Sequence, residues 1–88
     1  MTIEQTASIL AVAAKMLTEI GAITLDVDKG DARVHLRESD FANIPGDTAI
    51  RERDYDKYPF ELSKTIMGVK FFCVVDALPD ECKGGDQN

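Results

Sequence analysis

The stretch "ITLDVDKGDARVHL", residues 23–36, decides the fold because it reads as a β-hairpin, over 22–37, with one apolar face. Apolar and polar residues alternate on both sides of Lys29-Gly30, as in strands that bury one face. A two-residue turn there gives the apolar pairs Val27 with Ala32, Leu25 with Val34 and Ile23 with Leu36. The opposite face then pairs Asp26 with Arg33 and Thr24 with His35. A four-residue turn keeps the same register, so the pattern predicts the register and leaves these two turns open.

Residues 2–20 are predicted to form a helix with apolar side chains around about half of its circumference. Thr2 is a candidate N-cap with Gln5 three residues later, as in a capping box, and Gly21 is a candidate C-terminal glycine. The apolar residues form two neighbouring stripes, Ile3-Ala7-Leu10-Ala14-Leu17 and Ile9-Ala13-Met16-Ile20. A face this wide could cover a sheet, or cover a sheet and also meet a second subunit.

A second hairpin is predicted from residues 60–66 and 69–76, with its turn at Met67-Gly68. The expected partners are Ile66 with Val69, Leu62 with Cys73 and Phe60 with Val75. Lys64 opposite Phe71 is the least favourable pair. The second strand is apolar on both faces, which is typical of a central strand covered on both sides.

The segment between the hairpins is predicted to contain a short helix and a loop. Ser39 is a candidate cap for a helix from Asp40 to about Asn43, with Phe41 as its anchor. No periodicity holds from Asp47 to Pro59, so a loop is expected there. The element order α-β-β-α-β-β predicts an α+β fold with the N-terminal helix packed on a four-stranded, mostly antiparallel sheet. Residues 1–78 form the single expected domain, and residues 79–88 a flexible tail.

Composition narrows the classes of function. The 88 residues carry a formal net charge of −6, and residues 38–61 account for −4 of it. This charge disfavours direct binding to nucleic acid or to anionic membranes and favours a basic protein surface as partner. Two cysteines without a metal-ligand spacing fit reduced thiols, and hence the cytoplasm.

No catalytic, cofactor-binding or metal-binding constellation is recognised, so the chain is not expected to be an enzyme. The stretch Asp26–Asp31 resembles the start of a calcium loop, but Gly30 and Asp31 stand in the reverse order. His35 has no indicated partner beyond Asp26 and is expected on the polar face of its strand. Cys73 is expected to be an inert core thiol, and Cys82 an exposed one without an activating group.

The loop before the second hairpin is the predicted interaction site, because Tyr and Arg are enriched among the residues that dominate binding. The alternative is that this loop only packs on the sheet with its charges facing water. The candidate partner-binding residues are Arg51, Glu52, Arg53, Asp54, Tyr55, Asp56 and Tyr58.

The stretches "ARVHLRESDFANI" and "YPFELSKTIMGVKFFCVVD" resemble small uncharacterised accessory proteins of phages and prophages of Gram-positive bacteria. The shared pattern is a strand ending in "VHL", a short helix around Phe41, the pair Tyr58-Pro59 and a closing hairpin from Ile66 to Phe72. It covers about half of the chain and is hydrophobic rather than catalytic. The resemblance implies a phage accessory protein, and small acidic phage proteins include inhibitors of host defence such as anti-CRISPR proteins.

The predicted function is that of a non-enzymatic, phage-type accessory protein in the host cytoplasm that binds another protein. The analogy suggests that it inhibits a host defence system through its acidic and aromatic surface. One alternative is a structural homodimer without a separate client, joined through the wide helix face or through Phe72 and Val74. Another is a small-ligand-binding protein that uses His35 and the acidic loop.

Overall fold

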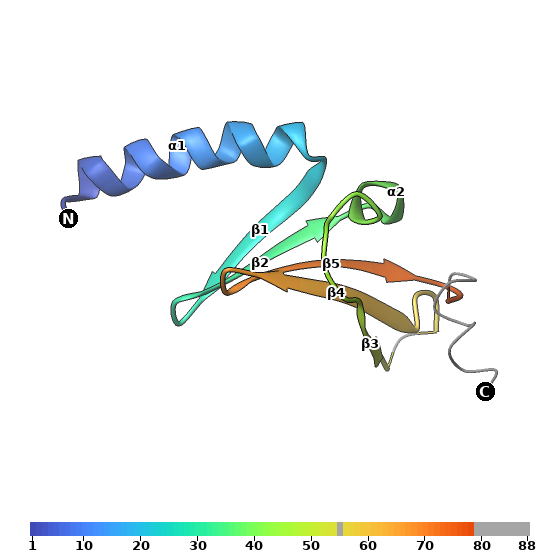
Figure 1. Ribbon diagram of the computed structural model, residues 1–88. Coiled ribbons are helices and arrows are strands. Elements are labelled where there is room, and N and C mark those ends of the chain that lie inside the picture. The colour runs from blue at the N-terminus through green and yellow to red at the C-terminus, as the bar shows by residue number, and fades with distance from the viewer. Residues whose placement is uncertain (55, 79–88) are drawn as a thin grey trace.

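The chain folds, in order, into α1 (Ile3–Glu19), β1 (Ala22–Asp28), β2 (Asp31–Leu36), α2 (Glu38–Phe41), β3 (Ala49–Glu52), β4 (Phe60–Ile66) and β5 (Val69–Val75). The structure is a computed structural model, and it describes residues 1–54 and 56–78 (Figure 1). The strands form one sheet in the order β1-β2-β5-β4-β3. The predicted tail, residues 79–88, lies outside the described residues.

The first hairpin has the predicted register over most of its length. Leu25 lies opposite Val34 and Val27 opposite Ala32, with Asp26 facing Arg33 and Thr24 facing His35. Lys29 and Gly30 have φ values of 51° and 86°. Two successive positive φ values are what a two-residue turn between twisted strands requires. The predicted pair of Ile23 with Leu36 is wrong, because the register shifts between Ala22 and Thr24 and places Ala22 opposite Leu36.

The second hairpin, β4–β5, has the predicted register from Phe60 opposite Val75 to Ile66 opposite Val69. Its two-residue turn also has positive φ values, 52° at Met67 and 82° at Gly68. β5 lies between β2 and β4, as its two apolar faces predict. The hairpin therefore forms the middle of the sheet.

The predicted sheet of four mostly antiparallel strands is wrong in two respects, because the sheet has five strands and is mixed. β2 and β5 run parallel, with Val34 opposite Phe71. The fifth strand, β3, lies in the predicted loop and pairs antiparallel with β4. All four β3 residues are exposed, so no burial pattern marks this edge strand in the sequence. Edge strands of this kind are often short and polar.

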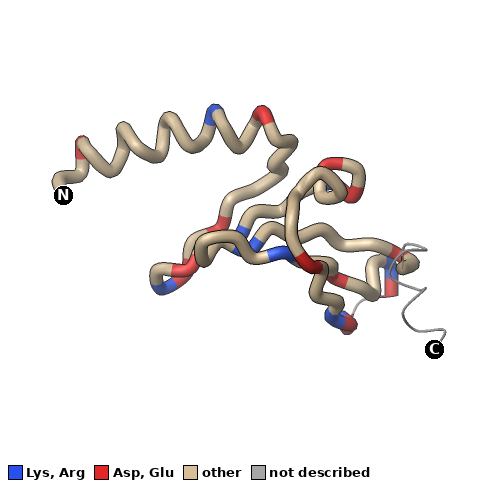
Figure 2. The backbone as a smooth tube through the Cα atoms, in the orientation of Figure 1, with Lys and Arg blue, Asp and Glu red and all other residues tan. Residues whose placement is uncertain are grey.

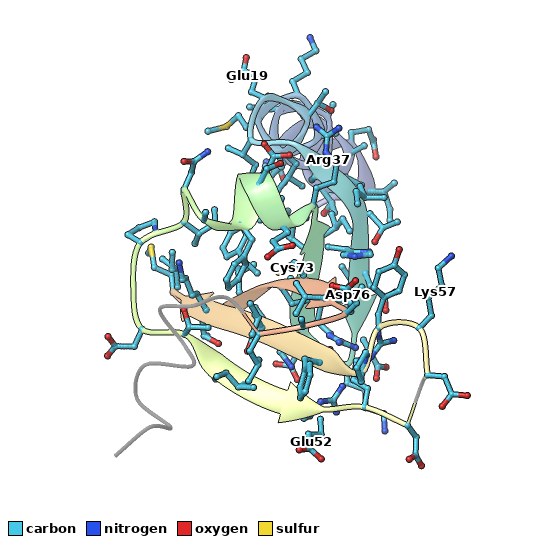
Figure 3. The ribbon with its side chains drawn as sticks, turned by 90° about the vertical axis from the view of Figure 1, so that its right-hand side faces the viewer. Glu19, Arg37, Glu52, Lys57, Cys73 and Asp76 are labelled. Carbon is cyan, nitrogen blue, oxygen red and sulfur yellow. The ribbon has the colours of Figure 1, made fainter. Side chains whose placement is uncertain are left out.

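One face of the sheet carries the core, which α2 covers. The buried apolar residues are Val34, Leu36, Phe41, Leu62, Cys73 and Val75. Figure 3 shows side chains filling the space between α2 and the sheet around Cys73. Phe41 is the predicted anchor, but the predicted cap is wrong: α2 begins after Arg37, and Ser39 lies inside it. Lys64 Nζ donates to the Ile44 carbonyl at 2.6 Å and lies 4.6 Å from the centre of the Phe41 ring, which accommodates this buried lysine.

The ends of α1 match the sequence, but its packing does not. The Thr2 hydroxyl accepts from the Gln5 N–H at 3.0 Å, and the Gln5 side chain accepts from the Thr2 N–H at 2.8 Å, which completes the predicted capping box. Gly21 follows the helix with φ 88°, and a Cβ there would meet the Asp40 carboxylate.

The prediction that this helix packs on the sheet holds only at its C-terminal end, where Leu17 packs against the core. No residue of α1 is buried, and the helix projects away from the sheet (Figure 1). Among the described residues, no helix has the length and apolar character needed to cross a membrane.

Candidate functional site on the polar face of the sheet

The face of the sheet opposite the core gathers charged and aromatic side chains from four strands. The parallel register places Arg33 beside Lys70 and His35 beside Phe72. The β3–β4 register places Arg51 beside Glu61. Residues opposite each other on neighbouring strands project from the same face, so these side chains share one surface.

Glu61 is the centre of this surface and is only 3% exposed. Its Oε1 lies 3.1 Å from Arg51 Nη2 and 3.4 Å from Arg33 Nη2, and its Oε2 lies 2.9 Å from Lys70 Nζ. One buried carboxylate therefore contacts three cations. A buried carboxylate needs such partners, because desolvation without them is costly.

The surroundings of Glu61 act on its pKa in opposite directions. Burial raises the pKa of this carboxyl, whereas the hydrogen bond and charge of Lys70 and the charges of Arg51 and Arg33 lower it. Together the three cations outweigh burial, so the pKa lies below its ordinary value of 4.5. Glu61 is therefore ionised at neutral pH and holds the cations together.

Phe72 contacts both an imidazole and a guanidinium. The His35 ring stacks on it with centres 4.8 Å apart and planes 6° from parallel, and the Arg33 guanidinium carbon lies 4.8 Å from the ring centre. Burial and then the charge of Arg53 lower the pKa of His35, against an opposing effect of Glu61. His35 is therefore neutral at pH 7 and acts as a flat packing surface rather than as a charge.

The position of the Arg33 guanidinium beside Phe72 and Glu61 costs free energy of folding. Its Nε atom is buried and has no hydrogen-bond partner among the described residues. A buried, unpaired donor costs about 1–3 kcal/mol. Contact with Phe72 and Glu61 therefore fixes Arg33 at the expense of full hydrogen bonding.

An open cleft of about 720 Å³ lies over this surface. The residues around it are Arg33, Arg51, Glu52, Arg53, Asp54, Glu61 and Phe72. The cleft has the volume of an ordinary ligand site, but it is polar and open, whereas small-molecule sites are mostly apolar and enclosed. Its form suits part of a larger partner better than an enclosed metabolite.

The structure brings four of the seven predicted site residues to this cleft: Arg51, Glu52, Arg53 and Asp54. Arg51 and Glu52 belong to β3 rather than to a loop. Figure 3 places Glu52 at the end of the molecule opposite Glu19 of α1. The β3 strand therefore carries the predicted site to the edge of the polar face.

Two further predicted residues, Asp56 and Tyr58, do not line the cleft. Asp56 is exposed, and the Tyr58 residue is 41% exposed, with Lys57 Nζ 5.6 Å from its ring centre. Tyr55 lies outside the described residues. The loop is tied to the sheet by Arg53, whose N–H donates to the Pro59 carbonyl at 2.6 Å and whose Nη1 donates to the Tyr58 carbonyl at 3.1 Å.

Four residues of the site were not predicted: Arg33, Glu61, Lys70 and Phe72. Strand alternation places Arg33 and Glu61 on the polar side of their strands, but it gives no such signal for Lys70 and Phe72, whose strand is apolar on both faces. What joins them is the parallel pairing of β2 with β5, which no local pattern indicates. Asp26 was the expected partner of Arg33 and does lie opposite it, but the Arg33 guanidinium contacts Glu61.

The other described residues considered as candidate metal-binding or reactive groups have structural roles in the hairpin turn or the core. Lys29 and Gly30 form the hairpin turn, as predicted instead of a calcium loop. Within residues 1–54 and 56–78, no group of three or more His, Cys, Asp or Glu side chains is placed to hold a metal ion. Cys73 is fully buried in the core, as predicted, and Cys82 lies outside the described residues.

Comparisons with known proteins do not assign the chain to a family. No protein-family model matches it. No match was found among curated proteins or among solved structures. The cleft is therefore the feature of the molecule that points to a function.

Proposed function

We propose that the protein is a non-enzymatic binding protein that recognises another protein through the cleft on its polar sheet face. The supporting observation is the composition of this cleft, in which Phe72 lies among Arg33, Arg51 and Arg53. Arginine and aromatic side chains dominate the energetics of many protein interfaces, because they bury large areas while keeping a polar group.

The floor of the cleft suits a carboxylate of the partner. Arg33 and Arg51 each approach Glu61 through Nη2, although a guanidinium carries five N–H donors. With Lys70 included, three positive charges surround one negative charge. A partner carboxylate would add charge-assisted hydrogen bonds to the two guanidinium groups beside Glu61.

The rim of the cleft suits basic groups around that carboxylate. Glu52 and Asp54 border the cleft, and Asp56 is exposed in the adjoining loop. The formal net charge of −6 attracts a basic partner surface at longer range. The proposed partner is thus a protein with a basic surface that presents an acidic side chain.

A phage-encoded inhibitor of a host defence system is one biological role that fits this mode of binding. Such an inhibitor would block a basic surface of its target. The phage origin and the target remain predictions based on the resemblance of residues 32–44 and 58–76.

A titration followed by amide chemical shifts tests the chemistry of the cleft. We expect a blocked tetraglutamate peptide to shift the amides of Arg33, Arg51 and Phe72, and a tetralysine peptide to shift those of Glu52, Asp54 and Asp56. The reason is that the negative peptide complements the arginines of the floor, and the positive peptide complements the carboxylates of the rim. Shifts confined to residues outside the cleft would contradict the proposed site.

Capture of partners from a lysate of the producing cells tests the proposed binding function, with two alanine variants as a matched pair. Arg51 and Arg37 have similarly exposed side chains, 64% and 68%, and each forms an ion pair with one carboxylate. Only Arg51 borders the cleft. We expect Arg51→Ala to lose a partner that Arg37→Ala and the unmodified chain retain. Equal recovery by all three proteins would count against this surface.

A further inference from the structure

The N-terminal half of the molecule exposes an apolar surface built from α1 and β1. Its large residues are Ile3, Ile9, Leu10, Val12, Met16 and Ile20 of α1 and the turn after it, and Ile23, Leu25 and Val27 of β1. Their exposed fractions range from 38% to 80%. The charged residues of α1 are Glu4, Lys15 and Glu19, and most of its tube is tan in Figure 2. At 100° per residue these three charges fall within one narrow sector, so most of the helix surface is apolar.

The two elements face the same region. α1 reaches the core cluster through Leu17, on the side of the sheet that Leu25 also faces. A hollow at this corner is bordered by Ala14, Leu17, Ile23 and Leu25, which shows that helix and strand meet there. Beyond the corner the helix projects past the sheet (Figure 1), so both apolar faces remain open.

β1 also leaves one backbone edge unpaired within the described part of the chain, since β2 is its only neighbour. The strand is seven residues long and contains no proline. An open edge of this length attracts another strand unless charge, a bulge or a covering element protects it. Here the bulge affects only the segment between Ala22 and Thr24, and the two charged residues, Asp26 and Asp28, lie in the second half of the strand.

We propose that α1 and β1 form a two-fold interface with a second copy of this chain, with β1 pairing antiparallel to β1 of the other copy. Pairing centred on Leu25 places Val27 beside Ile23 of the second copy on the apolar face. On the other face Asp26 lies opposite Thr24, so no like charges lie directly opposite each other. The strand is therefore complementary to itself, as a two-fold interface requires.

The exposed area agrees with what a dimer needs. Burying a large aliphatic side chain removes roughly 100 Å² of apolar surface from water. The nine side chains are together equivalent to about five fully exposed ones, so their complete burial in two copies would remove at most about 1,000 Å² from water. This reaches the roughly 1,000 Å² expected of a biological interface. The chain's own last ten residues, "PDECKGGDQN", contain no large aliphatic side chain with which to cover this surface.

Sedimentation equilibrium of the full chain at micromolar concentrations tests the proposal. We expect a mass near twice the 9.7 kDa of one chain. Leu10→Asp places a charge in the apolar face and should weaken dimerisation at least about 100-fold. Ser8→Asp adds the same charge on the polar side of α1 and should change the dissociation constant less than about threefold. A monomer at all concentrations would overturn the proposal, as would equal effects of the two substitutions.

A measurement on the unmodified sequence separates loss of the interface from loss of the helix. In a mixture of isotope-labelled and unlabelled copies, we expect intermolecular NOEs from the methyl groups of Leu10, Leu25 and Val27. Intermolecular NOEs only from the polar face of the sheet would place the interface elsewhere and reject this one. The polar-face cleft lies on other strands, so failure of the dimer would leave the proposed binding function standing.

Discussion

The middle of the sheet and the N-terminal arm carry similar apolar patterns but differ in what covers them. In β2, β5 and β4, alternate apolar residues are buried under α2, including Val34, Leu62 and Cys73. In α1 an apolar pattern of comparable strength buries no residue, and β1 has none buried either. An amphipathic pattern therefore predicts that a face needs a cover, but it does not say which chain supplies the cover.

The sharpest test of this difference compares two leucines. Leu36 is 1% exposed and Leu10 is 51% exposed. We expect Leu36→Ala to lower the free energy of unfolding by about 2–5 kcal/mol, because it leaves a cavity in the core. Leu10→Ala should cost less than about 1 kcal/mol in a dilute sample that is monomeric, since little packing is lost. Urea unfolding of both variants measures this, and similar losses would mean that α1 is packed in solution.

The next largest effect is expected on the polar face. Glu61→Gln removes the one negative charge among Arg33, Arg51 and Lys70 while keeping the shape of the side chain. We expect a loss of about 2 kcal/mol, smaller than for a fully enclosed pair because water still reaches the three cations. Thermal unfolding at pH 7 measures it. The same variant should bind tetraglutamate more tightly, and a weaker affinity would contradict the role given to Glu61.

Lowering the pH should reduce the free energy of unfolding of the unmodified protein in part as Glu61→Gln does. The pKa of Glu61 is lowered from 4.5, so its contribution to stability is complete above pH 4.5 and is lost as the pH falls through the folded-state pKa. The pKa of His35 is lowered from 6.5, so the unfolded state takes up that proton first and stability also declines below pH 6.5. Unfolding temperatures between pH 3 and 8 check both steps. The lower step should shrink in Glu61→Gln.

The smallest effect is expected at the start of the arm. Thr2→Ala removes the hydroxyl that caps Gln5 and should destabilise α1 by about 1 kcal/mol. Because a helix of 17 residues with little tertiary packing is marginal in water, the loss should be local. Hydrogen exchange should quicken along α1 and stay unchanged in β5. Faster exchange in both would show that the arm and the sheet unfold together.

Local sequence signals predicted the elements that depend on neighbours along the chain. The register of the second hairpin, and that of the first from Thr24 to the turn, follow from alternation and from the turns at Lys29-Gly30 and Met67-Gly68. The ends of α1 follow from Thr2 and Gly21. β3 was not predicted, because its four residues are all exposed and show no alternation of apolar and polar side chains. The parallel pairing of β2 with β5 was not predicted, because the residues of two strands that are far apart in sequence do not indicate that the strands pair.

The same limit applies to the candidate site. Arg51 and Arg53 were recognised from their composition beside the tyrosines, and both border the cleft. Glu61 and Phe72 were read as residues of a strand, and only the order of strands brings them to that cleft. The pattern of charges along one segment therefore predicts only the site residues of that segment, and not those that other strands contribute.

The parallel pair of β2 and β5 also has a consequence for the order of folding. Ala32 lies opposite Val69, so this pairing closes a loop of 69 − 32 = 37 residues, whereas both hairpins close across two-residue turns. Closing the longer loop costs more chain entropy, and this cost comes before the stabilising contacts between β2 and β5 form. Docking of the two hairpins is therefore expected to be the slow step of folding. Val34→Ala, which weakens the pairing of β2 with β5, should therefore slow refolding in stopped-flow measurements. The molecule is then two quickly formed hairpins whose rate of folding depends on how soon β2 finds β5.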